Sequence, residues 1–443
     1  MTGKKWLRAG GMVLLGCSLF LFTAFRLEDG PPSGEQTPLD NGTNIRNLIV
    51  IISDIHLGGD AGYQECNANR SALVNFLDQV KNSPNVKELV IAGDLFDEWF
   101  VPGNLDTYRG GDQQDFVKRI ASTNQPVFDA FNSIIQDGKI TVTYVPGNHD
   151  LTITDVNVSR VLPGIRQARD AGAQGLGSYS PAGLPEMVIE HGHRYNFFCA
   201  PDPISNQSVA PGTILPPGYF FTRIAAMHVV EHTQHNVDTL PPVTKNGSGE
   251  PGQVLLYNYW HIWSWAINFL PVNRRFDDKF IKTNVNGFTG NWCVKDLIPY
   301  QQTPGGPIQV NLFNGIQDTW ESRCRLNHLN VPIPTDFAIK YANSANGTDT
   351  MAYWQYFNYA PSGKRIVVFG HTHEARIKEF TVSGNTCIYA NSGTWIDHNP
   401  NLTTMNFVII IPQSSEPSSR TFVRLYNFQK ETMTLMDEKS VRL

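Results

Sequence analysis

Five predicted strands of this chain are each followed, at once or after one or two turn residues, by aspartate, histidine or asparagine. Continuous β-branched runs such as residues 47–53 predict strands that are buried on both faces, as in sheets that lie between layers of helix. Functional loops collect at the carboxyl edge of such sheets, so this repetition indicates one polar site. The five strands are expected at residues 47–53, 88–92, 139–145, 187–190 and 365–369.

Strands and helices alternate along most of the chain, which predicts an α/β fold with mostly parallel strands. Residues 70–80 carry apolar side chains at helical spacing, and Pro126 is placed as the opening residue of another helix. Between His193 and Arg365 the alternation lapses. The 443 residues are enough for one large domain with a long insertion. Further strands are expected at residues 386–390, 406–411 and 421–426.

These changes along the chain predict its domain organisation. The expected units are an N-terminal signal peptide or membrane anchor (1–26), a linker (27–45), a core in two parts (46–195 and 363–443) and an inserted cap of helices and loops (196–362). The aromatic run at residues 257–265 has helical spacing and is expected to form the core of the cap rather than a lipid-binding surface.

The N-terminal segment has the layout of a secretory signal or a short membrane anchor. Lys4, Lys5 and Arg8 precede an apolar run that ends at Phe25. We therefore expect an exported protein, periplasmic or extracellular, with membrane association through the N-terminus if the segment is retained.

Charge and cysteine content exclude some classes of site. The net charge of −5 argues against a nucleic-acid partner, because phosphate binding usually needs a basic surface. The cysteines after Cys17 lack any CxxC spacing and form neither a zinc cluster nor a disulfide framework. A bridge between Cys293 and Cys324 and a set of free thiols both remain open.

The residues after the five strands form an ordered set of ligand types. Taken singly, each fragment is a weak signal, because a histidine after a strand is more often structural than a ligand. Together, and in this order, they resemble the calcineurin-like metallophosphoesterase family over residues 47–195 and 363–430. The set comprises Asp54 and His56, Asp94, Asn148 to Asp150, His191, and His371 and His373.

This resemblance implies a four-layer α-β-β-α sandwich of two stacked mixed sheets and a site for two divalent metal ions. Oxygen and imidazole ligands without thiolate suit manganese, zinc or iron. The implied reaction is in-line attack on a phosphate ester or phosphoanhydride by a hydroxide held between the two ions. By resemblance, Asp54, His56 and His373 bind one ion, Asn148, His191 and His371 bind the other, and Asp94 bridges both.

The resemblance also implies catalytic groups that do not bind metal. His149 would stabilise charge or protonate the leaving oxygen, and Asp150 would either orient His149 or cap the turn. Three further residues are expected to touch the substrate or to lie behind the ligands: Asp97, His193 and Asn391.

Two segments indicate which branch of the family the chain resembles. Residues 93–99 and residues 191–193 are similar to UDP-2,3-diacylglucosamine pyrophosphatases. Purple acid phosphatases have tyrosine three residues after the bridging aspartate, where this chain has Asp97. However, His149 stands where the lipid-A enzymes have arginine. We therefore expect a phosphorylated small molecule or lipid as the substrate, with pyrophosphatase action on a nucleotide-linked sugar or lipid as the alternative.

Two other classes of function compete with this interpretation. Residues 228–232 match the HxxEH motif of zinc peptidases, in which His228 and His232 would share one helix face. No third ligand stands near this motif in the sequence. A non-catalytic binding module is the other alternative, and the intact set of ligand types argues against it.

Overall fold

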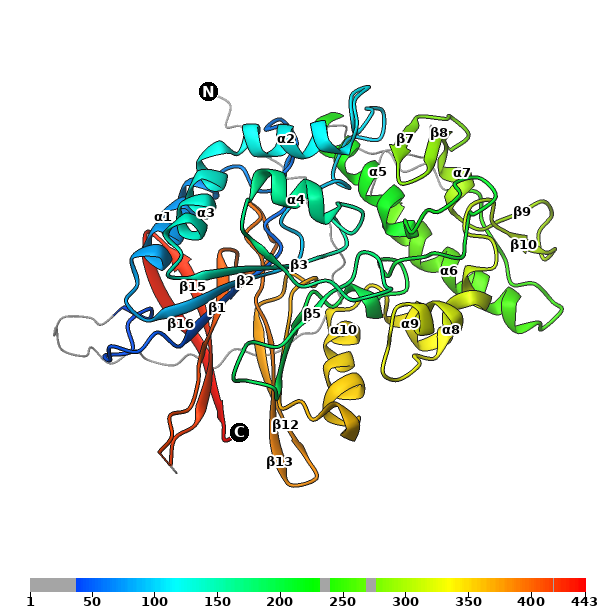
Figure 1. The fold of residues 1–443 in the computed structure, drawn as a ribbon. Helices are drawn as coiled ribbons and strands as arrows, with labels where there is room; N and C mark the ends of the chain where they lie inside the picture. The colour runs from blue at the N-terminus through cyan, green and yellow to red at the C-terminus, as the bar shows by residue number, and fades with distance from the viewer. Residues whose placement is uncertain (1–36, 232–239, 268–275, 417) are drawn as a thin grey trace, which may run out of the picture.

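Two mixed β-sheets form the centre of the protein (Figure 1). The computed structural model describes residues 37–231, 240–267, 276–416 and 418–443. In the first sheet the strand order is β16-β15-β14-β1-β2-β3-β4, and β1 to β4 run parallel. Its strands are β1 (Leu48–Ile52), β2 (Val86–Ala92), β3 (Thr141–Val145), β4 (Arg166–Gln167), β14 (Asn406–Ile411), β15 (Thr421–Gln429) and β16 (Thr432–Val441).

The second sheet has the strand order β12-β13-β11-β6-β5. Its three central strands are parallel, and β12 and β5 are antiparallel to their neighbours. The strands are β5 (Ser178–Tyr179), β6 (Met187–Glu190), β11 (Ile366–Phe369), β12 (Arg376–Val382) and β13 (Asn385–Asn391). The two sheets therefore draw their strands from both ends of the chain, as a domain split by an insertion requires.

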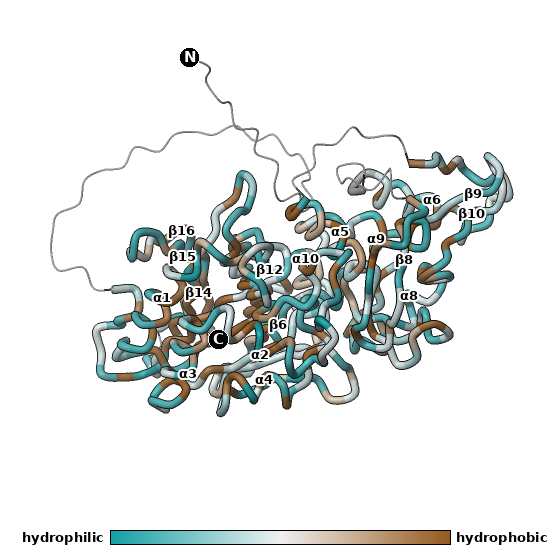
Figure 2. Tube along the Cα trace, turned by 90° about the horizontal axis from the view of Figure 1, so that it is seen from above, coloured by the Kyte–Doolittle hydropathy of each residue, from teal (hydrophilic) through white to brown (hydrophobic). Residues whose placement is uncertain are grey.

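The side chains of β1 show how the layers pack. Ile49 and Ile51 belong to a buried cluster with residues from the second sheet, among them Ile189. Leu48 and Val50 belong to another cluster, which includes the helices that cover the first sheet. Because side chains alternate along a strand, the two faces of β1 meet two different layers. Figure 2 shows hydrophobic chain segments gathered around β14 and β6. This packing confirms the predicted α/β class.

Four helices cover the outer face of the first sheet (Figure 1). The apolar residues of the first one, which include Leu73 and Leu77, fall on one side and are buried. Pro126 is the second residue of α3, and that helix ends at Gly138, whose φ of 69° suits glycine. The helices are α1 (Arg70–Asn82), α2 (Gln113–Thr123), α3 (Gln125–Asp137) and α4 (Asp155–Val161).

The outer layer of the second sheet comes from the end of the predicted insertion. Helix α10 (Ala345–Ala352) and the single-turn helix η3 (Tyr353–Phe357) pack on this sheet. Tyr353 lies 5.7 Å from Phe380 of β12, measured between ring centroids. Asp349 accepts a hydrogen bond from Tyr389 of β13 and pairs with Arg376 at 2.9 Å. The last segment of the predicted cap of residues 196–362 therefore packs on the second sheet.

The rest of the insertion forms a lobe beside the sheets (Figure 1). It contains two short hairpins besides the predicted helices and loops, because alternating segments such as residues 281–285 pair locally. Tyr259 and Trp263 of the aromatic run are buried, as expected for a core stripe. The lobe comprises α5 (Pro217–Glu231), α6 (Pro251–Ile267), β7 (Ile281–Val285), β8 (Phe288–Trp292), α7 (Val294–Leu297), β9 (Tyr300–Gln301), β10 (Ile308–Gln309), α8 (Ile316–Leu326) and α9 (Thr335–Tyr341).

The predicted signal or anchor at residues 1–26 lies outside the described residues. Of the predicted linker, the part from residue 37 onward is held against the domain. Leu39 is buried, and the Asn85 side chain donates hydrogen bonds to the carbonyls of Thr43 and Ile45. Within the described ranges, no helix has both the length and the hydropathy needed to cross a bilayer.

The sequence left open a disulfide bridge or free thiols, and the structure shows free thiols. The five cysteines after Cys17 are all unpaired, so a bridge between Cys293 and Cys324 is not formed. Cys324 is buried, and burial raises the pKa of its thiol.

Buried arginines hold the insertion together, and Arg323 gives a test of this. Its fully buried guanidinium donates to the carbonyls of Phe197 and Ala200 at 3.2 and 2.6 Å. Arg323→Met leaves these carbonyls without a partner, so we expect the free energy of unfolding to fall by about 2–4 kcal/mol. Arg325 is on the same helix and 61% exposed, and Arg325→Met is the control, with a change within about 0.5 kcal/mol. Urea denaturation of both variants measures the difference, and equal stabilities would contradict the prediction.

Candidate metal centre

The ends of the central strands bring the predicted ligands together. In the first sheet Ile52 pairs with Ile91, and Ala92 pairs with Val145, so β1, β2 and β3 end side by side. The turns that follow these strands meet the turns after β6 and β11 of the second sheet. All seven predicted metal ligands lie in the resulting cluster: Asp54, His56, Asp94, Asn148, His191, His371 and His373.

One part of the cluster contains Asp54, His56 and His373. The Nε2 atom of His373 lies 3.2 Å from Oδ1 of Asp54 and 3.2 Å from Nε2 of His56. The ligand atoms of all three residues lie within 4.8 Å of one another. This is the set that the sequence predicts for one metal ion.

The other part of the cluster is centred on Asn148. Its Oδ1 atom lies 3.0 Å from Nε2 of His191 and 2.8 Å from Nδ1 of His371. The Oδ2 atom of Asp94 lies 3.1 Å from Nε2 of His191 and 3.6 Å from Nε2 of His56. Asp94 thus stands between the two parts, where a bridging carboxylate would have to be.

Backbone hydrogen bonds join the ligand turns to one another. The amide of His149 donates to Oδ1 of Asp94 at 2.8 Å, and the amide of His371 donates to Asp54 at 3.0 Å. The carbonyl of Asp94 accepts from the amide of His56 at 2.9 Å. Each carboxylate is therefore fixed by a turn from another strand, which holds it in place before any ligand binds.

The backbone of most predicted ligands is in the left-handed region. Residues other than glycine rarely adopt it, and each instance costs about 1 kcal/mol or more unless the surroundings enforce it. Such strain gathers at functional sites, so its presence at these turns supports a site here. The five ligands and their φ angles are Asp54 (53°), His56 (54°), Asp94 (54°), His371 (69°) and His373 (59°).

Two glycines leave the space that the ligands occupy. A Cβ atom on Gly147 would lie 2.1 Å from Oδ1 of Asp94, and one on Gly370 would lie 2.5 Å from Oδ2 of Asp54. These distances are far shorter than van der Waals contact. Any side chain at either position would displace a predicted ligand.

Gly147→Ala is accordingly expected to disrupt the centre. The added methyl group must push Asp94 away from His191, so we expect bound metal to fall below a tenth of its wild-type amount, with a loss of about 2 kcal/mol or more in stability. Elemental analysis and thermal unfolding measure the two effects. Normal metal content in a folded variant would contradict the prediction.

Electrostatics favour cations at this place. Burial opposes ionisation of Asp94, but the charges of His191 and His149 outweigh it and hold the pKa of Asp94 well below its usual value. The pKa of Asp54 is also lowered against burial, chiefly by His191 and His373. Buried anions require nearby positive charge. Two ionised carboxylates among imidazole nitrogens and an amide oxygen, without thiolate, fit divalent metal ions.

Hydrogen bonds also set which imidazole nitrogen faces the centre. Nδ1 of His191 lies 2.9 Å from the carbonyl of Ala92 and donates to it, which leaves Nε2 directed at Asp94 and Asn148. Nδ1 of His56 lies 3.0 Å from Oδ2 of Asp97, which leaves Nε2 directed at His373. A partner on one nitrogen that frees the other is the usual arrangement of a metal-binding histidine.

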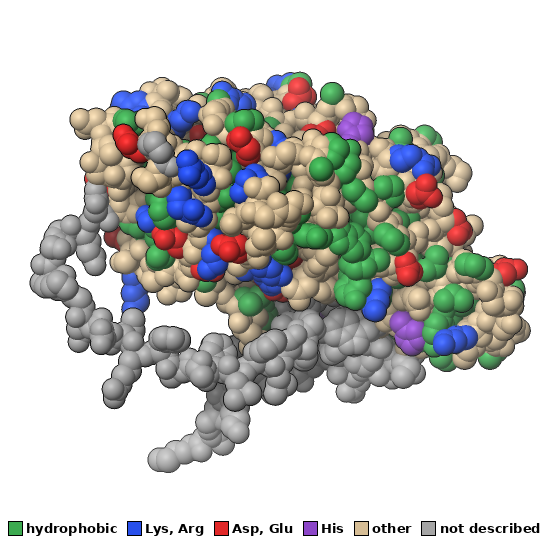
Figure 3. Space-filling model, turned by 90° about the horizontal axis from the view of Figure 1, so that it is seen from below, with side chains coloured by type: hydrophobic (Ala, Val, Ile, Leu, Met, Phe, Trp, Pro, Cys, Tyr) green, Lys and Arg blue, Asp and Glu red, His purple; other side chains and the backbone are tan. Residues whose placement is uncertain are grey.

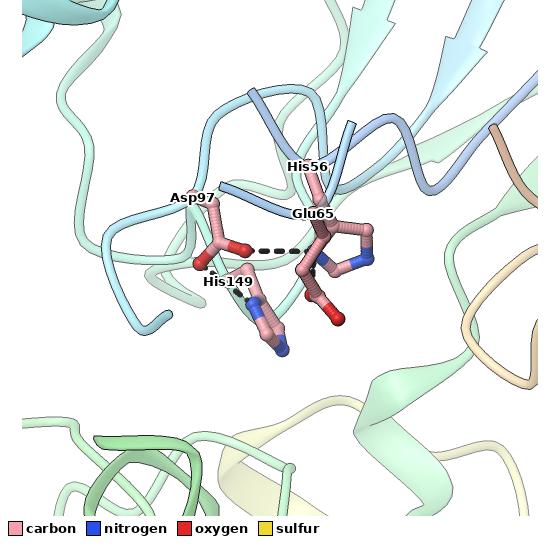
Figure 4. A group of neighbouring side chains, drawn as sticks. All are labelled: His56, Glu65, Asp97 and His149. Carbon is pink, nitrogen blue, oxygen red and sulfur yellow. Dashed lines mark hydrogen bonds and ion pairs between the residues drawn. The ribbon is translucent and has the colours of Figure 1, made fainter. Parts of the chain in front are cut away.

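Asp97 contacts His149, and Asp150 takes the second of its two predicted roles. Oδ1 of Asp97 lies 2.8 Å from Nδ1 of His149, so one carboxylate holds both His56 and His149 (Figure 4). Asp150 does not orient His149. Its carboxylate accepts from the amides of Leu95 at 2.9 Å and Gly147 at 2.6 Å, so it caps the turn. Burial, followed by the charge of Asp94, raises the pKa of Asp150 to about 6.

Glu65 lies at the site although its sequence position does not predict it. One oxygen of its carboxylate lies 3.4 Å from Nδ1 of His56, beside Asp97 and His149 (Figure 4). The carbonyl of Glu65 accepts the amide of Asp397, and the carboxylate of Asp397 accepts the amide of Asn67 at 2.9 Å. Glu65 lies in a loop far from any predicted strand end, so no pattern in the sequence pointed to it.

The two other predicted accessory residues lie behind the ligands. His193 is buried, its Nε2 atom lies 3.1 Å from the carbonyl of Gly175, and its Nδ1 atom has no partner among the described residues. Asn391 is buried and donates to the carbonyl of Gly370 at 2.6 Å, which supports the turn before His371. The alternative peptidase site cannot be placed, because His232 lies outside the described residues.

Comparison with known proteins agrees with this site. Residues 48–225 match the family model described as calcineurin-like phosphoesterase. This segment carries the predicted ligands from Asp54 to His191, while His371 and His373 lie beyond it. The match supports the predicted superfamily and indicates a hydrolase that acts on phosphoester bonds, and it favours neither the peptidase nor the binding module.

Among solved structures, the chain is similar to the nuclease MPE of Pseudomonas putida. The two chains are 17% identical, and the similarity covers 36% of this chain and 56% of the nuclease, with a TM-score of 0.20. The chain thus spans little more than half the length of that nuclease. No curated protein matches the chain.

Proposed function

We propose that the protein hydrolyses a phosphate ester or phosphoanhydride with the help of two divalent metal ions. The observation that carries this proposal is the convergence of seven ligand-type side chains from the ends of five strands. Five of these seven residues have a backbone in the left-handed region. Strain of this kind gathers at functional sites, which supports a chemical use for these turns.

The residues divide between the two ions as the family resemblance implies. Asp54, His56 and His373 would hold one ion, and Asn148, His191 and His371 would hold the other. Asp94 would contact both. When bound, the ions would acidify a coordinated water and neutralise charge on the phosphoryl oxygens. The donor set suits manganese, zinc or iron.

In this proposal, His149 acts on the leaving group. Burial opposes ionisation of Asp97, but the charge and hydrogen bond of His149 outweigh it and lower the pKa of Asp97. An ionised carboxylate accepts only, so Nδ1 of His149 carries a hydrogen and Nε2 faces away from Asp97. Burial lowers the pKa of His149, but the Asp97 carboxylate outweighs it and raises that pKa above its usual value. A raised pKa favours the protonated imidazole, which is the form that a general acid requires.

The substrate is proposed to be a phosphorylated small molecule or lipid, handled outside the cytoplasm. Acidic and basic side chains are interspersed on the face shown in Figure 3. The net charge of −5 favours small ligands over a nucleic-acid polyanion, which binds to basic surfaces. The similarity of residues 93–99 to UDP-2,3-diacylglucosamine pyrophosphatases keeps a nucleotide-linked sugar or lipid as the second candidate.

Metal removal and reloading test the proposal. The protein is stripped with a chelator, reloaded with Mn²⁺, and assayed on p-nitrophenyl phosphate, bis-p-nitrophenyl phosphate and a nucleotide diphosphate sugar. We expect the stripped protein to be inactive and the reloaded protein to hydrolyse at least one of these, with two metal ions per chain by elemental analysis. Absence of both bound metal and metal-dependent turnover would overturn the proposal.

A further inference from the structure

An indole ring lies against the proposed catalytic imidazole. The rings of Trp99 and His149 are stacked, with centroids 4.9 Å apart and planes 27° apart. His56 meets His149 edge to face at 4.4 Å. The hydrogen bond to Asp97 fixes one atom of the His149 ring, and the stacked indole fixes its plane. The orientation of His149 therefore depends on where Trp99 lies.

Trp99 is itself placed by packing more than by polar contacts. Its amide donates to Oδ1 of Asp97 at 3.0 Å, the same atom that binds His149. The indole is 1% exposed, and its Nε1 atom has no hydrogen-bond partner in the part of the chain that the structure describes. The neighbours of the ring must then determine its position.

The first turn of helix α5 in the inserted lobe supplies those neighbours. A Cβ atom on Gly218 would lie 3.1 Å from Cζ3 of Trp99 and 2.7 Å from the carbonyl oxygen of Phe198. The ring of Tyr219 meets the indole edge to face, with centroids 6.2 Å apart. Helix α5 can lie this close because residue 218 has no side chain.

The same helix also binds the segment that follows Trp99. Arg223, one turn after Tyr219, is fully buried. Its guanidinium donates to the carbonyls of Val101 at 2.6 Å, Pro102 at 3.1 Å and Leu105 at 2.5 Å. Helix α5 is thereby fastened to Trp99 through ring packing and to the chain just after it through hydrogen bonds.

We infer that Trp99 is a positioning residue through which helix α5 of the inserted lobe sets the orientation of His149. The inference rests on the proposed function of His149 at the leaving group. A shift of α5 moves the indole, and the indole moves the imidazole relative to the leaving oxygen. This path runs through Trp99 and His149, neither of which is a predicted metal ligand, so the lobe acts on leaving-group departure.

A double-mutant cycle tests the link between Trp99 and His149. Trp99→Ala, His149→Ala and the double variant are assayed on phenyl and p-nitrophenyl esters, with metal content measured for each. A misplaced catalytic group costs about 10²-fold, so Trp99→Ala is expected to lower kcat by about that factor on the phenyl ester and less on the p-nitrophenyl ester. Trp99→Phe should restore most of kcat. In the His149→Ala background, Trp99→Ala should cost less than about twofold.

Equal losses from Trp99→Ala in both backgrounds would overturn the inference and leave the proposed function standing. Unchanged kcat in His149→Ala would instead refute the proposed role of His149, and the inference with it. The two failures are therefore distinguishable.

A second experiment changes a residue of the lobe and does not require a measurement of turnover. Gly218→Ala places a methyl group against Trp99 and the carbonyl of Phe198. A Cβ atom on Gly247 would meet no atom within 4 Å, so Gly247→Ala is the matched control. A crystal structure of Gly218→Ala is expected to show the indole displaced and the His149 ring turned away from Asp97, with Gly247→Ala unchanged. A His149 ring in its original place beside a shifted α5 would overturn the inference.

Discussion

Asp94→Asn is expected to remove bound metal and hydrolysis together. Asp94 stands between the two parts of the centre, and its carboxylate lies 3.6 Å from His56 on one side and 3.1 Å from His191 on the other. An amide keeps the shape and loses the charge. Metal ions contribute several kcal/mol to such reactions, so kcat should fall by about 10³-fold or more. Elemental analysis and an assay on the same sample measure both effects.

Asp137→Asn is the control for this substitution. Asp137 ends helix α3 and pairs with Lys139 at the surface, 3.0 Å away. The same chemical change there should leave metal content and kcat unchanged, because surface ion pairs contribute little. Full activity of Asp94→Asn with metal still bound would mean that the bridging carboxylate is not required.

His149→Ala is expected to separate catalysis from metal binding. The imidazole donates to Asp97 and stacks on Trp99, and His149 is not among the predicted ligands. Loss of a general acid costs about 10²–10⁴-fold, so kcat should fall by that factor while metal content stays normal. The loss should be largest for esters with a poor leaving group, which most need a proton. Steady-state kinetics on phenyl and p-nitrophenyl esters, with elemental analysis, measure these effects.

A His149→Ala variant that loses its metal would assign the imidazole to the ligand set instead. We expect the metal to remain bound, because His149 contacts Asp94 through its backbone amide, 2.8 Å away. The substitution keeps this amide. Asp94 should therefore stay in place.

The central strands and the ligand set were predictable because each has a local signature. A strand buried on both faces, such as β1, appears as an unbroken apolar run. The polar residue directly after it is unusual enough to be noticed. Since parallel strands end at a common edge, the separate fragments could be placed in one site without knowing their distances.

Edge strands, and side-chain contacts between residues far apart in the sequence, have no local sequence pattern of this kind. Strand β12 has one buried residue, Ile377, and carries charges at Arg376, Lys378 and Glu379, so its sequence resembles a polar loop. The pairing of Asp97 with His149 joins residues that are 52 positions apart, and Asp150 was the nearer carboxylate in sequence. Glu65 reaches the site from a loop that Asp397 holds across the fold. These contacts arise from packing, which spacing along the chain does not reveal.

Anomalous diffraction from crystals grown with Mn²⁺ tests the central claim most directly. We predict two anomalous peaks within the cluster, one beside Asp54, His56 and His373 and one beside Asn148, His191 and His371, with Asp94 between them. A cluster without any peak, or metal bound only elsewhere in the protein, would contradict the proposed two-metal centre.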